Sequence, residues 1–87
     1  METFSARLWK IGSSIVFTLP SQLVAQFTGY FIQVNGVVDG KNMIFMMQPW
    51  KCGGSFVITV PKQYVEAFDL GKIVRNKDEI SLSIEKV

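Results

Sequence analysis

The sequence predicts a mainly β fold built from two tandem, pseudo-symmetric ββαββ units with one short helix in each. The main observation is an internal repeat, because Trp9–Pro20 recurs as Trp50–Pro61, displaced by 41 residues. The displacement holds without a gap from Trp9/Trp50 to Ile32/Ile73, and 11 of those 24 aligned pairs are identical. Self-similarity at a fixed period points to a repeated structural unit, and two copies suit a pseudo-two-fold object better than a solenoid.

The size of the chain indicates that the two repeats share one core. The chain has 87 residues, which is enough for one compact domain covering residues 1–87, with repeat one at about 4–48 and repeat two at about 50–87. Units of roughly forty residues seldom fold alone without a disulfide, a metal or a partner. The composition is 48% hydrophobic and 18% charged, which is typical of a globular chain rather than a disordered one.

Net charge and cysteine content limit which ligands, cross-links and cellular location the protein is expected to have. The net charge of +2 and a pI near 8.9 permit nucleic-acid binding without demanding it. Cys52 is the only cysteine, so no internal disulfide and no cysteine-based zinc site is expected, and a small core residue is the favoured reading of Cys52. No signal peptide and no apolar run of about 18 residues stands out, which favours a cytoplasmic protein without a membrane segment.

In repeat one, the elements follow from local patterns. Phe4–Trp9 alternates and predicts a strand, the turn at Gly12-Ser13-Ser14 predicts a hairpin, and Ile15–Leu19 is a β-branched and aromatic strand. Pro20 ends that strand and begins a helix with Leu23, Val24 and Phe27 on one face, closed by Gly29. Strands at Phe31–Val38 and Met43–Met47 then flank Asp39-Gly40, a strong hairpin-turn signal.

Repeat two predicts the same plan. Strands at Trp50–Cys52 and Ser55–Val60 flank the Gly53-Gly54 turn. Pro61 begins a helix through Tyr64, Val65 and Phe68, and Gly71 is expected to end it. Strands are then expected at Ile73–Arg75 and Ile80–Ile84.

The repeated pattern resembles the swapped-hairpin AbrB/MazE-like family of transcription factors. The resemblance rests on a strand, a Gly-x-Ser turn, an apolar strand ending in Thr-x-Pro, a short helix and a closing hairpin. The residues that carry it are Trp9, Gly12, Ser14, Thr18 and Pro20, then Trp50, Gly53, Ser55, Thr59 and Pro61, with Lys62-Gln63 at the second helix start and Val38–Lys41 at the closing hairpin. Members usually carry one unit per chain and interleave hairpins from two chains, so the resemblance implies a single-chain β-barrel here.

The resemblance also implies a double-stranded DNA site on the hairpin strands and turns of one barrel face. Carried over by position, this site comprises Arg7, Trp9, Lys10, Gly12, Ser13, Trp50, Lys51, Gly53 and Gly54. Lysine and arginine suit phosphate oxygens, and glycine turns approach the backbone closely. The alternative is structural: the tryptophans fill a core seam and the lysines are solvated charges that protect strand edges.

No enzyme and no cofactor is expected. The chain has no histidine, its acids are scattered, and neither glycine turn has the spacing of a P-loop or dinucleotide-binding motif. The sequence therefore favours a nucleoid-associated transcriptional regulator that binds specific duplex DNA. Two alternatives stay open: a protein-interaction or antitoxin-like module, favoured by an apolar set at Met43, Phe45 and Met47, and a non-specific chromatin-like DNA binder. Pairing of two barrels also stays open.

Overall fold

The computed structural model describes all 87 residues, Met1–Val87. Ten elements follow along the chain: β1 (Glu2–Ile11), β2 (Ser14–Thr18), α1 (Ser21–Phe27), β3 (Ile32–Val38), β4 (Lys41–Met47), β5 (Trp50–Cys52), β6 (Ser55–Thr59), α2 (Lys62–Ala67), α3 (Leu70–Asn76) and β7 (Glu79–Lys86). The fold is mainly β, as the sequence predicts. The three helices have only six or seven residues each, and none of them could span a membrane.

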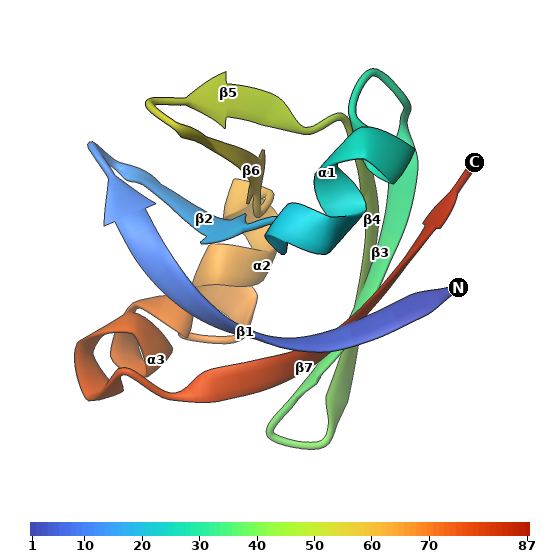
Figure 1. Ribbon diagram of the computed structural model, residues 1–87. Helices are drawn as coiled ribbons and strands as arrows, with labels where there is room; N and C mark the ends of the chain where they lie inside the picture. Colours follow the sequence, from blue (N-terminus) through green and yellow to red (C-terminus); the bar gives the residue numbers. More distant parts are fainter.

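All seven strands belong to one antiparallel sheet with the order β4-β3-β7-β1-β2-β6-β5. The sheet curls strongly into a half-barrel (Figure 1). Its two outermost strands, β4 and β5, are consecutive in the chain and are joined only by Gln48-Pro49. β7, from the second half of the chain, lies between β3 and β1 of the first half, so the two halves are intertwined.

The first contact between the halves is symmetric about one residue pair. In the β2–β6 pairing, Phe17 lies opposite Ile58, its own equivalent 41 residues later. The flanking hydrogen bonds are related in the same way, because Leu19 N donates to Phe56 O at 2.8 Å and Val60 N donates to Ile15 O at 2.9 Å. A pseudo-two-fold axis therefore passes between Phe17 and Ile58.

The second contact between the halves has the same symmetry with a longer offset. In the β3–β7 pairing, Asn35 lies opposite Ser83, while Val34 pairs with Ile84 and Gly36 with Leu82. This arrangement is symmetric if β7 is the equivalent of β3 at an offset of 48 residues. The difference from 41 equals the seven residues of α3, so α3 is an insertion in the second half.

The insertion explains where the sequence reading of repeat two is wrong. Ile73–Arg75 is not a strand but part of α3, so the molecule has three helices rather than two, and the second unit is ββααβ rather than ββαββ. Leu70 is buried and Ile73 and Val74 are partly buried against the core, which is the i, i+3, i+4 spacing of a helix face. Gly71 lies inside α3, because the break that separates α2 from α3 is Asp69 at φ 50°.

A single core joins the two halves. Eighteen buried hydrophobic residues form one cluster, to which β2 contributes Phe17 and β6 contributes Ile58. Met43 and Phe45 belong to this cluster, and Met47 packs against it. The prediction that these three residues offer an apolar surface to a protein partner is therefore wrong. The exposed apolar residues of β4 are instead Ile44 and Met46, because alternate residues of a strand face opposite sides.

Candidate nucleic-acid interface

Two equivalent hairpins project from the same side of the molecule. We call the β1–β2 hairpin between Trp9 and Thr18 the first arm, and the β5–β6 hairpin between Trp50 and Thr59 the second arm. Both turns lie on the left in Figure 1, whereas the two chain termini lie on the right. All nine residues predicted for the DNA site are exposed, and eight of them lie on the arms. Arg7 lies on β1 just before the first arm.

Each arm ends in a two-residue turn that requires glycine at its first position. The pairs Ile11/Ser14 and Cys52/Ser55 close the ladders. Gly12 has φ 60° and Gly53 has φ 61°, whereas the second turn residues, Ser13 and Gly54, do not have positive φ. This is the pattern of a type II′ turn, whose twist matches that of the flanking strands.

A tryptophan–threonine hydrogen bond stiffens each arm in the same way. The indole Nε1 of Trp9 donates to Thr18 Oγ1 at 3.0 Å, and that of Trp50 donates to Thr59 Oγ1 at 2.8 Å. Neither tryptophan belongs to the buried core, because their exposed fractions are 38% and 40%. The tryptophans thus lie on the outer face of the sheet with their N–H groups already bonded, and their flat rings are the part left for a ligand.

The two tryptophans protect a small apolar layer outside the main core. Trp9 lies opposite Val16 and Trp50 lies opposite Val57 in the strand register. Both valines are completely buried, yet neither belongs to the main core cluster. The tryptophans therefore have a structural role on the outer face.

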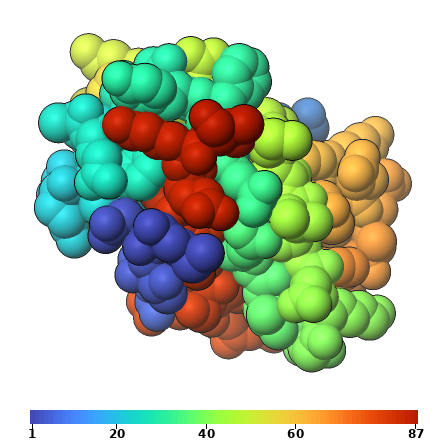
Figure 2. Space-filling view, turned by 90° about the vertical axis from the view of Figure 1, so that its right-hand side faces the viewer, coloured from blue at the N-terminus to red at the C-terminus, as the bar shows by residue number.

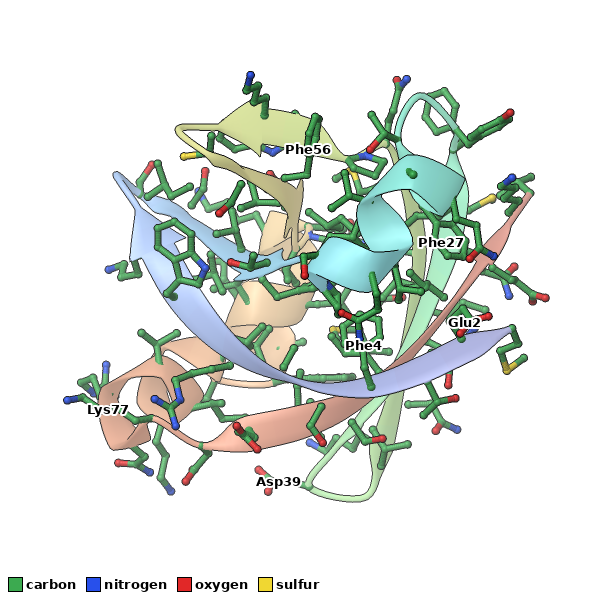
Figure 3. The ribbon with its side chains drawn as sticks, in the orientation of Figure 1. Glu2, Phe4, Phe27, Asp39, Phe56 and Lys77 are labelled. Atoms are coloured by element: carbon green, nitrogen blue, oxygen red, sulfur yellow. The ribbon has the colours of Figure 1, made fainter.

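The arms carry basic residues and no acid. Lys10 and Lys51 are equivalent and exposed, and no Asp or Glu occurs between Thr3 and Val38 or between Gly40 and Val65. The acids Glu2 and Asp39 lie away from the hairpin turns (Figure 3). The two hairpins themselves therefore offer lysines and no carboxylate to a phosphate backbone, and the nearest acid, Glu66, belongs to the helix beside the first turn.

The predicted basic residues do not all share one side of the arms. Adjacent strand residues point to opposite faces, so Lys10 projects opposite to Trp9, and Lys51 opposite to Trp50. Arg7 lies on the outer side with Trp9, but its cross-strand neighbour on β7 is Glu79. Lys51 also lies on β5, an edge strand, where charge discourages strand addition.

A hollow of about 400 Å³ lies between the first arm and α2. Its lining includes Ser13 and Ser14 of the first arm together with Lys62 and Glu66 of α2. The site prediction omitted Lys62, although its position directly after the repeated Thr-x-Pro segment was a signal. The equivalent residue in the first half is Ser21, so this additional cation belongs to one side only.

A metal site and the Cys52 thiol are the other candidates for a functional site. No group of three or more His, Cys, Asp or Glu side chains gathers where it would hold a metal ion. Cys52 is half-buried next to the second turn, as its equivalent Ile11 is, and neither belongs to the core cluster, so the core position expected for Cys52 is wrong. Comparisons with protein-family models, with curated proteins and with solved structures find no match to this chain.

Proposed function

We propose that this protein is a single-chain, swapped-hairpin DNA-binding protein that recognises specific duplex sequences and regulates transcription. The observation that carries the proposal is the pair of equivalent arms, which present Lys10 and Lys51 on acid-free hairpins related by a pseudo-two-fold axis. Duplex DNA has local two-fold symmetry, so a protein with paired reading elements suits a palindrome-like site. The resemblance of the repeated motif to the AbrB/MazE-like family supports the same function.

The binding site on DNA is expected to be short and only approximately palindromic. The whole molecule measures 31 Å in its longest direction, against about 34 Å for one turn of B-DNA, so the two arms together span at most about one turn. The equivalent of Arg7 is Gln48 and the equivalent of Ser13 is Gly54. The two half-sites are therefore contacted by similar but unequal sets of residues.

A direct test starts with selection of tight binders from random duplexes, followed by titrations over a range of salt concentrations. Enrichment of a sequence supports a regulator. Equal affinity for all duplexes supports the chromatin-like alternative, and absence of binding removes the proposal.

The arms are then tested with Lys10→Ala/Lys51→Ala. We expect the affinity for the selected duplex to fall about tenfold or more. The slope of log affinity against log salt concentration should become less steep by about 0.9 for each phosphate contact removed. The matched control is Lys41→Ala/Lys86→Ala, which removes the same charge away from the arms. Equal losses for both double variants would show that only net charge matters.

A further inference from the structure

One face of the sheet carries no covering layer. The outward side of β4, β3, β7 and β1 is uncovered by any helix, and these strands reach the surface side by side in Figure 2. We call this side the neutral face. Its central side chains are Thr3, Asn35, Val37, Asn42, Ile44 and Ser83, and the strand register places Ile44, Asn35, Ser83 and Thr3 in one row.

The neutral face is partly apolar. Val37, Ile44 and Met46 are 54%, 52% and 58% exposed, which is high for large apolar side chains that lie together on two neighbouring strands. Contiguous apolar surface framed by polar groups is typical of an interaction site.

The polar part of the neutral face is almost free of charge. Its polar groups are amides and hydroxyls, such as the Thr3 and Ser83 hydroxyls, whose oxygens are 3.1 Å apart. Its charged side chains are Glu85, to which the amide of Gln33 donates at 3.4 Å, and the Arg7–Glu79 pair at the border with the first arm. A face whose one cation lies opposite a carboxylate does not suit phosphates, so its centre is not a continuation of the DNA site.

We propose that two copies of this chain pair through the neutral face. In a two-fold interface the same patch meets itself, so like charges would oppose each other, whereas amides and hydroxyls both donate and accept and therefore complement their own copy. The lack of charge combined with exposed apolar groups fits this partner better than a strongly charged one. The proposal does not depend on DNA binding.

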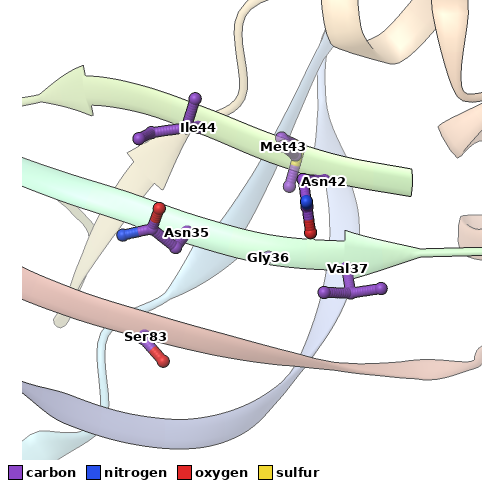
Figure 4. A pocket seen from close by; sticks show the side chains of 7 residues that line it. All are labelled: Asn35, Gly36, Val37, Asn42, Met43, Ile44 and Ser83. Carbon is purple, nitrogen blue, oxygen red and sulfur yellow. The ribbon is translucent and has the colours of Figure 1, made fainter. Parts of the chain in front are cut away.

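The pairing is face to face rather than edge to edge. β4 is an edge strand, but the Tyr64 hydroxyl of α2 donates to the Ile44 carbonyl oxygen on it. This bond occupies a backbone group that a second strand would need. The neutral face itself has a hollow of about 440 Å³ beside Asn35, Asn42 and Ile44 (Figure 4), which offers room for a side chain of the second copy.

The area of the neutral face indicates how tightly two copies of the chain can associate. Four strands about 4.8 Å apart, with five to seven residues at about 3.3 Å each, span roughly 400 Å². Specific interfaces bury about 800 Å² on each partner, so the dimer is expected to be weak and reversible. Pairing would leave both arms free, because only the start of β1, around Thr3, belongs to the centre of the face, whereas the first arm begins at Trp9. A dimer would carry four arms.

The test is sedimentation velocity of the full chain without DNA, from about 10 µM to about 1 mM, which covers weak association. We expect the mass to rise from one copy to two across this range. Ile44→Lys places a charge in the face at an exposed position and is expected to weaken association at least tenfold while the fold, measured by circular dichroism, is retained. Gln63→Lys adds the same charge on the exposed surface of α2 and is expected to leave association unchanged.

A disulfide cross-link between two copies locates the two-fold axis of the dimer and does not depend on the Ile44→Lys variant. In a Cys52→Ser/Ser83→Cys chain, mild oxidation is expected to join two copies, whereas Cys52→Ser/Gln63→Cys stays unlinked. A chain that remains one copy at the highest concentration overturns the proposal. So does an equal effect of Ile44→Lys and Gln63→Lys.

Discussion

Residues 9–27 and residues 50–68 take the same course, whereas the segments that follow them diverge. Each copy makes a hairpin with a glycine at φ near 60°, a tryptophan–threonine bond and a proline that leads into a short helix. After Phe27 the first half turns at Gly29, φ 88°, directly into β3. After Phe68 the second half inserts α3 before it reaches β7.

The molecule keeps its symmetry where the two halves pair and where the arms project, and loses it between those regions. The β2–β6 and β3–β7 pairings are both symmetric despite the insertion, because α3 adds residues outside the sheet without changing its register. The insertion is nevertheless integrated, since Leu70 is completely buried in the shared core.

The largest expected effect comes from the pseudo-two-fold axis. Phe17→Ala removes a fully buried ring opposite Ile58 and is expected to cost about 3–5 kcal/mol, a large share of the stability of a small domain. Urea unfolding of single-tryptophan variants that keep Trp9 or Trp50 measures it. Both probes should report one shared transition at the same lowered midpoint, and separate midpoints would contradict a shared core.

The next effect concerns the part that only the second half has. Leu70→Ala is expected to destabilise by about 2–5 kcal/mol, because the side chain is fully buried. Lys72→Ala on the exposed side of α3 is the control and should change stability by less than about 0.5 kcal/mol. If Leu70→Ala were as mild as its control, α3 would be a detachable surface insertion.

A smaller effect separates the two residues of one turn. Gly53→Ala is expected to cost about 1–2 kcal/mol, because Gly53 has φ 61°, where a Cβ is disfavoured. Gly54→Ala meets no atom within 4 Å and has no positive φ, so it should be neutral or stabilising by about 0.4–1 kcal/mol. Thermal unfolding of the two variants compares them directly, and the reverse order would refute the type II′ assignment.

The smallest effect tests the equivalence of the arms. Thr18→Val and Thr59→Val each remove one acceptor for an indole N–H and are expected to cost about 0.5–1.5 kcal/mol. The two costs should agree within a few tenths of a kcal/mol if the arms are equivalent. Chemical denaturation gives both values, and a loss confined to one arm would break the comparison.

Repeat one and the first part of repeat two were predictable because their signals are local. Glycine turns, the Thr-x-Pro strand ends and the Asp39-Gly40 hairpin each specify the backbone through their own residues, and Asp39 at φ 51° with Gly40 at φ 77° confirms the last. The alternation that predicts β1 also appears in its burial, since Ala6 and Leu8 are buried and Arg7 between them is exposed.

The insertion was not predictable from the repeat itself. The gap-free alignment matched Ile32 with Ile73, but the structural equivalent of Ile32 is Ile80, which faces the core from β7 as Ile32 does from β3. The offset of 41 residues was applied beyond Phe68, the last pair that still matches in the structure. It therefore predicted a strand at Ile73–Arg75, although the apolar spacing of Leu70, Ile73 and Val74 is that of a helix. The neutral face was missed for a related reason, since exposed and buried residues of β4 alternate and the sequence does not state which set is inside.

Whether both arms contact one DNA site is decided by titrating the selected duplex with Lys10→Ala and Lys51→Ala as separate variants. We expect each variant to lower the affinity by a similar factor and the double variant to lower it by about the product of the two factors. A variant of either arm that binds as tightly as the unchanged chain would contradict it.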